Sequence, residues 1–297
     1  MEQKEPMELG LQLLKDINIV RHNEFRFINA EFGFVTSFSK METTIFSIGQ
    51  PYRLQEGRIT IATNGSARVL INLIEYTFRP NYISLISPGS IVQIIETSHD
   101  FDAHMMALDL NFLPISGKEE FFTHFLQQKK NLLLPLTTEE QVQIENFITV
   151  MWSVLQEPVF RKEVIQHLLA GLLYNIEYIK GKGEAELSPL THQNDIFQRF
   201  ISLVNTYSKT ERNVSFYADK LCLTPRYLNT VIRQTSQQTV MDWINQSIIL
   251  EAKVLLKHSN LLIYQISDGL NFPNPSFFCK FFKRITGMTP QEYQKSK

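Results

Sequence analysis

Two segments in the last hundred residues decide the fold. Residues 214–233 read VSFYADKLCLTPRYLNTVIR, and residues 262–284 read LIYQISDGLNFPNPSFFCKFFKR. Each has a short amphipathic stretch, a tight break and a second amphipathic stretch that opens with a proline. Proline is well tolerated in a first helical turn, and Thr224 and Asn274 stand where an N-cap is expected. Each segment therefore predicts a helix-turn-helix.

The two segments occur together, about 50 residues apart, which is more specific than either alone. Residues 240–258 lie between them and carry apolar side chains at the spacing of one long helix. The second helix of a helix-turn-helix can enter the DNA major groove. We therefore expect an all-α domain over residues 194–297, in which a linker helix joins two DNA-binding halves.

The composition is that of a globular protein, with 297 residues of which 43% are hydrophobic and 20% charged. No run of about 18 apolar residues occurs, and the N-terminus lacks a secretory pattern, so we expect a cytoplasmic protein without a membrane span. Cys222 and Cys279 are the two cysteines. Neither has a second thiol or a histidine at metal spacing, which favours simple thiols in a reducing compartment.

Charge is distributed unevenly along the chain. Residues 213–297 hold ten Lys/Arg and five Asp/Glu, a net charge of +5, whereas the remainder carries −6 within a total of −1. A basic end on an acidic body suits a nucleic-acid contact that is confined to that end.

Short segments rich in Val, Ile, Phe and Thr follow one another from about residue 25 to residue 110, separated by turn residues. Asn64-Gly65 is a strong hairpin signal, because it adopts positive φ at little cost. Several short strands at this spacing predict an antiparallel barrel or sandwich. The segments are residues 32–38, 43–48, 58–63, 67–78, 82–87, 90–97 and 103–110.

Helical periodicity replaces this pattern from about residue 118. It predicts helices over residues 119–130, 138–156 and about 158–181. The last two have more apolar surface than the flank of a small barrel needs. Homodimerisation through residues 138–180 is one interpretation, and packing on the barrel is the other.

Residues 182–193 are polar, contain glycine and end after Pro189, which predicts a flexible linker. The chain is thus expected to be α+β. An N-terminal antiparallel β-barrel with flanking helices would occupy residues 1–181, before the linker and the helical domain.

Residues 194–294 resemble the DNA-binding domain of the AraC/XylS family of bacterial transcription regulators. The most specific part is NPSFFCKFFKRITGMTPQEY at residues 274–293, and LTPRYL at residues 223–228 agrees in order and spacing. By layout alone, the predicted barrel resembles the cupin-like sensing and dimerising domain of such regulators. The resemblance implies a sequence-specific regulator that binds promoter double-stranded DNA, with a small-molecule effector in the barrel, and leaves RNA polymerase open as a further partner.

The chain departs from the family pattern at five places. Ile248 and Gln294 stand where the family usually has arginine, which puts DNA affinity in question more than the fold. Ser267 stands where alanine is usual, and glycine is common near Ser236 and at Asn271. Asparagine tolerates left-handed backbone better than most residues, so we expect the second turn to form.

The DNA contacts are predicted on the exposed faces of the two second helices. In the first, Leu228, Val231 and Ile232 suit the core. Arginine can pair bidentately with guanine and asparagine with adenine, whereas the lysines suit phosphate. Phe277 either touches a thymine methyl group or packs. The predicted set is Arg226, Asn229, Thr230, Arg233, Asn274, Ser276, Phe277, Cys279, Lys280, Lys283 and Arg284.

No catalytic motif is visible, so we expect no enzyme, no catalytic residue and no cofactor. His99 and His104 form a close histidine pair, but a metal site of the cupin kind needs about three histidines and a glutamate, so no metal is expected.

An effector in the barrel mouth would meet polar rim residues. The candidates are Arg53, Arg58, Arg68, Tyr76, Tyr82 and His104, each equally explained as a surface residue. A cavity of about 300 Å³ or more would favour a ligand sensor. A barrel filled by its own phenylalanines would favour the alternative, a ligand-free module for protein interaction and dimerisation.

Overall fold

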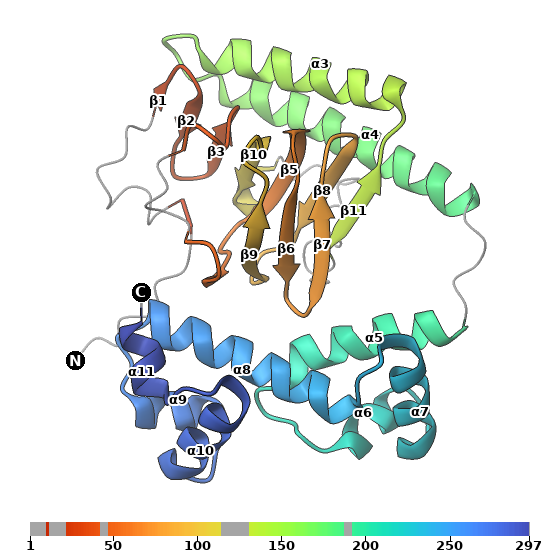
Figure 1. The fold of residues 1–297 in the computed structure, drawn as a ribbon. Coiled ribbons are helices and arrows are strands. Elements are labelled where there is room, and N and C mark those ends of the chain that lie inside the picture. The colour runs from red at the N-terminus through yellow and green to blue at the C-terminus, as the bar shows by residue number, and fades with distance from the viewer. Residues whose placement is uncertain (1–9, 12–21, 42–46, 114–130, 187–191, 297) are drawn as a thin grey trace. The chain divides into compact units, whose positions relative to one another are not determined.

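The structure, a computed structural model, describes residues 10–11, 22–41, 47–113, 131–186 and 192–296. The chain divides into two compact units, one made mainly of Leu9–Ile71 and Glu75–Ser188, the other mainly of Pro189–Lys297. The first unit contains β-sheets and two long helices, and the second is helical (Figure 1). The predicted α+β class is therefore confirmed.

The β strands of the first unit form two sheets. The larger has the order β1 (His22–Asn23), β2 (Arg26–Ile28), β3 (Phe32–Val35), β10 (Asp102–Leu108), β5 (Gly57–Asn64), β8 (Tyr82–Ile86) and β11 (Leu132–Pro135). The smaller has the order β4 (Pro51–Arg53), β9 (Ile91–Thr97), β6 (Ala67–Ile71) and β7 (Ile74–Phe78). The registered strand pairs are antiparallel, as predicted.

The larger sheet buries a different set of side chains on each face. Along β5, Ile59 and Ile61 belong to the core shared with the helices, whereas Arg58 and Thr60 line a cavity on the opposite face. This alternation follows from the two-residue period of a strand.

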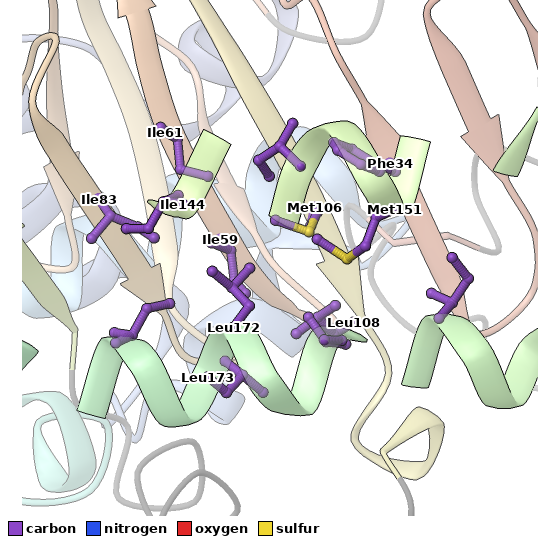
Figure 2. Packing of buried hydrophobic residues seen from close by; sticks show 14 of the residues in the cluster. Phe34, Ile59, Ile61, Ile83, Met106, Leu108, Ile144, Met151, Leu172 and Leu173 are labelled. Atoms are coloured by element: carbon purple, nitrogen blue, oxygen red, sulfur yellow. The ribbon is translucent and has the colours of Figure 1, made fainter. Parts of the chain in front are cut away.

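Two helices, α3 (Thr138–Leu155) and α4 (Lys162–Glu186), cover one face of the larger sheet and complete the first core. Figure 2 shows side chains of the sheet meeting those of α3 and α4; its labelled members are Phe34, Ile59, Ile61, Ile83, Met106, Leu108, Ile144, Met151, Leu172 and Leu173. Each buried aliphatic side chain contributes about 1.5–3 kcal/mol relative to exposure. On both α3 and α4, the side chains in this core lie on the face that packs against the sheet.

Several strands differ from the sequence prediction. Residues 67–78 form two strands because Asn72 between them has a left-handed φ of 55°. The strand expected over residues 32–38 ends at Val35. The sequence also failed to indicate β1, β2, β4 and β11, which are two to four residues long and carry little periodicity. The predicted helix over residues 119–130 and most of the strand over 43–48 lie outside the described residues.

Helix α3 begins with a capping box, in which the Thr137 hydroxyl accepts from the Glu140 amide and the Glu140 carboxylate accepts from the Thr137 amide. Residues 182–186, predicted to be linker, are instead the last turn of α4. Glu184, Ala185 and Glu186 favour helix and offset the cost of the nearby glycines. Lys182 Nζ also lies 3.6 Å from Glu140 Oε1 on α3.

A short 3₁₀ helix (Leu110–Phe112) follows β10 in the first unit. The second unit consists of α5 (His192–Tyr207), α6 (Val214–Lys220), α7 (Pro225–Ser236), α8 (Val240–His258), α9 (Ile263–Gly269), α10 (Pro275–Thr286) and α11 (Pro290–Lys295). Helix α5 begins at His192, two residues before the predicted start of the helical domain at residue 194.

The second unit contains an internal repeat, in which α6 and α7 correspond to α9 and α10. Cys222 and Asn271, 49 positions apart, each follow the first helix with left-handed φ values of 57° and 55°. The expectation that Asn271 supports this turn is thus confirmed. The second turn is one residue longer, so Pro275 lies 50 positions after Pro225.

The repeat continues beyond the second helix of each half. Helix α7 ends at Gln237 with a φ of 60°, and α10 ends at Gly287 with a φ of 79°. Capping boxes then open the next helices, Thr239 with Asp242 in α8 and Thr289 with Glu292 in α11. Left-handed caps and capping boxes fix where a chain leaves one helix and enters the next.

A cation–π contact ties the two halves together besides α8. The Arg212 guanidinium lies 3.8 Å from the ring centroid of Phe272 and donates a hydrogen bond to the Leu270 carbonyl. The Asn271 side-chain amide donates to the Thr210 carbonyl at 3.1 Å. The loop before α6 therefore holds the turn between α9 and α10.

Candidate nucleic-acid interface

Helix α7 presents a polar face opposite its buried residues. Leu228, Val231 and Ile232 are fully buried, as predicted. Arg226, Thr230 and Arg233 are exposed. The helix thus has the division expected of a recognition helix, with one face in the core and the other in solvent.

Two of the predicted contacts on α7 hydrogen-bond to their own helix. The Asn229 amide donates to the Pro225 carbonyl at 3.1 Å, and the Thr230 hydroxyl donates to the Arg226 carbonyl at 3.0 Å. Asn229 is also half-buried. Each of these bonds uses one donor of the side chain and leaves its acceptor oxygen available, and in the described part of the chain neither Arg226 nor Arg233 makes such a bond to the helix backbone.

Helix α10 carries a more basic face. Phe278 and Phe282 are fully buried, and Ser276, Lys280 and Lys283 are exposed. Arg284 is also exposed, with its guanidinium 5.7 Å from the Phe281 ring centroid. The lysines present their charges at one surface of the helix.

Asn274 and Cys279 are less available than the lysines. The Asn274 side-chain oxygen accepts from the Phe277 amide at 3.1 Å, so it caps the helix as the sequence predicts. Cys279 is half-buried, and burial raises the pKa of its thiol. Asn274 therefore caps the start of α10, and Cys279 lies at the edge of the exposed face of that helix.

Each of the two faces has one acidic group near a basic side chain, Asp242 near Arg233 and Glu292 near Lys283. Asp242 lies close enough to Arg233 for its charge to lower the Asp242 pKa, although hydrogen bonds from Thr239 are the larger cause. In the part of the chain that the structure describes, no ion pair involves Arg226 or Lys280. These two charges are therefore available for contact with DNA.

Helix α8 separates the two recognition helices. Figure 1 shows α7 beside one end of α8 and α10 beside the other, within one unit. Its 19 residues span about 28 Å, which approaches the ~34 Å turn of B-DNA. Ile248, where the family usually has arginine, is fully buried in this helix, and Gln294 is exposed on α11.

The first unit holds a cavity of about 70 Å³ between its two sheets. Most of its lining is aliphatic or aromatic, with Tyr52, Arg58 and Thr60 as polar members. The Arg58 guanidinium bonds to Glu56 at 3.0 Å, and burial lowers the Arg58 pKa while Glu56 opposes that shift. The other Glu56 oxygen accepts from the Leu11 amide at 2.6 Å.

Arg58 is the one predicted effector contact among the cavity-lining residues. Arg53 donates to the Gly89 carbonyl at 2.9 Å, and exposed Arg68 pairs with Glu75 and Glu96. The prediction that these rim residues converge on one barrel mouth is therefore not matched by the cavity. The sequence missed Tyr52 and Thr60, although the alternation in residues 57–64 was a usable signal.

The remaining three candidates, Tyr76, Tyr82 and His104, are not among the residues that line this cavity. Tyr76 packs against the core between the sheets, where burial raises its pKa. Tyr82 accepts from Arg79 at 2.8 Å. His104 lies in β10 and faces the helix-covered side of the sheet. Its Nε2 lies 3.3 Å from Glu145 of α3.

Within residues 10–11, 22–41, 47–113, 131–186 and 192–296, no three His, Cys, Asp or Glu side chains are grouped so as to hold a metal ion. The same described residues include no helix with the length and apolar character that a membrane crossing requires.

Comparison with known proteins finds matches to part of the chain. Residues 217–296 match the family model described as a helix-turn-helix domain. The transcriptional activator RhaR of Escherichia coli (strain K12) is 28% identical over 106 residues, which are 36% of this chain and 38% of RhaR. These matches agree with the resemblance to AraC/XylS regulators that the C-terminal sequence shows. The chain thus aligns with less than half the length of this curated relative.

Solved structures show similarity of a more distant kind. ToxT from Vibrio cholerae, solved with an unsaturated fatty acid bound, is 16% identical with a TM-score of 0.42, covering 90% of this chain and 95% of ToxT. The C-terminal domain of the response regulator yesN from Fusobacterium nucleatum is 24% identical with a TM-score of 0.31, covering 34% of this chain and 97% of that domain.

Proposed function

We propose that the chain is a sequence-specific transcription regulator that binds promoter double-stranded DNA through residues 194–297. The observation that carries this proposal is the repeated helix-turn-helix, whose two exposed basic faces stand near opposite ends of α8. Arg226 and Arg233 of α7 are candidates for guanine, and the lysines of α10 are candidates for phosphate. Such regulators act where the chromosome lies, so a cytoplasmic location and contact with RNA polymerase are part of the proposal.

Binding-site selection from a random double-stranded library tests this function. The full chain should enrich a sequence containing two short elements about one helical turn apart. Failure to enrich any sequence, with binding that is equally tight to random DNA, would reject sequence-specific regulation.

Lys280→Ala tests the phosphate contact on the selected DNA. Affinity should fall uniformly across sequences, and the slope of log K against log salt should lose about one unit. Lys295→Ala, on α11 outside the recognition helices, is the matched control and should keep the slope. An unchanged slope for Lys280→Ala would remove that residue from the phosphate set.

For residues 1–181, the cavity volume favours a protein-interaction and dimerisation module over a ligand sensor. About 70 Å³ is well below the ~300 Å³ of typical ligand sites. Phenylalanines occupy part of the space, since Phe38 and Phe101 line the cavity with ring centroids 5.6 Å apart. A thermal-shift screen with sugars and small metabolites tests the sensor alternative. A ligand at 100 times its Kd should stabilise by about 2.7 kcal/mol.

The dimer is proposed to form through α4, on the side away from the core. Val164, His167, Tyr174 and Tyr178 are exposed at spacings of three, seven and four residues, and so share one face. Tyr178 is 71% exposed although it lies on a long apolar helix. A second copy that covers this face would bury these side chains.

Sedimentation of a Tyr174→Glu, Tyr178→Glu double variant tests the dimer. The wild type should sediment as a dimer and the variant as a monomer, because two carboxylates would be buried against their copies. Tyr264→Glu, an exposed tyrosine of α9, is the control. A monomeric wild type at micromolar concentration would reject this part of the proposal.

A further inference from the structure

Each recognition helix exposes one aromatic ring at the same place in the repeat. Tyr227 lies two residues after Pro225, and Phe277 lies two residues after Pro275, exactly 50 positions further on. Tyr227 is 43% exposed and Phe277 is 60% exposed. The neighbouring residues of the two faces differ in charge and size, so the shared ring is a property of the repeat and not of one half.

These two rings differ from the aromatic residues that form the core beside them. Phe278, next to Phe277, is fully buried, with its ring 5.3 Å from Phe272 and 5.9 Å from Phe282. For Tyr227 and Phe277, no ring–ring or cation–π contact occurs within the described residues. Aromatic packing within the domain therefore does not account for them.

The helix caps fix the backbone that carries each ring. The Thr224 hydroxyl accepts from the Tyr227 amide at 3.2 Å, and the Asn274 side-chain oxygen Oδ1 accepts from the Phe277 amide at 3.1 Å. Both rings thus project from the first turn of a capped helix. In a helix-turn-helix the N-terminal residues of the second helix reach the base edges.

The chemistry of the ring limits what it can recognise there. A phenylalanine ring offers no hydrogen bond to a base, so it cannot read guanine, cytosine or adenine by their polar edges. Thymine alone presents an apolar group, its C5-methyl, in the major groove. Tyr227 adds a hydroxyl, but the position it shares with Phe277 indicates that the ring is the common element.

We propose that Tyr227 and Phe277 are a matched pair of specificity residues, each covering a thymine methyl group in one of two successive major grooves. This inference rests on the proposed function. It predicts that the selected DNA carries one thymine at equivalent places in its two elements. It also places sequence reading in α10, which the lysines alone would not provide.

Replacing single thymines by deoxyuridine in the selected DNA tests the pair, because this removes one methyl group and nothing else. The wild-type chain should lose about fourfold in affinity at one position in each element, as expected for one buried methyl group. Tyr227→Ala should abolish the loss at one of these positions only, and Phe277→Ala at the other only. Tyr264→Ala should keep both losses.

Two further outcomes decide between explanations. Tyr227→Phe should bind as the wild type does. If Tyr227→Phe and Tyr227→Ala weaken binding equally, and deoxyuridine at the corresponding thymine does not change the wild-type affinity, the Tyr227 hydroxyl contacts phosphate. That result would overturn the inference for Tyr227. Sequence-specific binding that tolerates deoxyuridine at every thymine would overturn the inference and leave the proposed function standing. Absence of sequence-specific binding would reject the proposed function itself.

Discussion

The Arg212 guanidinium stacks 3.8 Å from the ring centroid of Phe272, across 60 positions of sequence. Arg212 belongs to the loop before α6, and Phe272 belongs to the turn between α9 and α10. The same guanidinium donates to the Leu270 carbonyl. This contact joins the loop before the first helix-turn-helix to the turn of the second, so it helps α8 to fix the distance between the two recognition helices.

Arg212→Ala should lower the free energy of unfolding by about 2 kcal/mol, since it removes a partly buried cation–π contact and a charged hydrogen bond. Affinity for the selected DNA should fall as well, because the two halves lose their fixed spacing. Urea denaturation and a binding titration measure these effects. Arg199→Ala, which removes an exposed pair with Asp195, should change stability by less than about 0.5 kcal/mol. Equal effects of the two variants would contradict the spacing role.

Ser267→Ala should raise the free energy of unfolding by about 1 kcal/mol. The Ser267 side chain is fully buried, and its hydroxyl has no hydrogen-bond partner within the described structure. The repeat places Ala218 at the equivalent position, 49 residues earlier, where it is also fully buried. The reverse change, Ala218→Ser, should destabilise by a similar amount in the same denaturation experiment. A stabilising Ala218→Ser would contradict this account.

Gln237→Gly should stabilise the chain by about 1 kcal/mol, because Gln237 ends α7 with a φ of 60°, where a side chain is strained. Its counterpart Gly287 has a φ of 79° and an open site for a Cβ. Gly287→Ala should therefore destabilise through backbone strain alone. The two melting temperatures should move in opposite directions, and a shift in the same direction would rule out strain as the cause.

Acid should weaken the start of α8 through Asp242. Hydrogen bonds from Thr239 hold the Asp242 pKa below its usual 3.8. A depressed pKa gives stability that is present above pH ~3.8 and is lost as pH falls through the folded-state value. Asp242→Asn should therefore cost stability at pH 6, and the gap from the wild type should narrow below pH ~4 in urea titrations. A gap that stays constant with pH would show that the charge contributes nothing.

The sequence predicted those parts of the fold that have a local signature. Helix ends were predicted from single residues, namely Thr224, Asn274 and Gly287, and the structure has a helix cap at each. The cap of α3 was displaced by one residue, since Thr137 takes the place expected for Thr138. Where a single side chain decides a turn, sequence alone was enough.

The contacts that were missed depend on distant parts of the chain. Arg212 has no neighbour in sequence that suggests Phe272, and His104 gave no sign that its face of β10 meets Glu145. Tyr227 could have been found, because the 50-residue offset aligns it with Phe277. Most of the predicted DNA contacts are exposed on α7 and α10, and the exceptions, Asn229 and Cys279, are half-buried.

The internal repeat contains positions in each half at which a single substitution can raise the stability of the domain. Cys222, Gln237 and Asn271 occupy left-handed positions without being glycine, and Ser267 holds an unbonded hydroxyl where its counterpart is alanine. Replacing Cys222 or Gln237 by glycine, or Ser267 by alanine, would raise stability without altering an exposed recognition face. Substitutions on α7 or α10 that shift the preferred DNA sequence could therefore be compensated within the same domain. Such compensation gives the protein latitude to acquire new target sites while it remains folded.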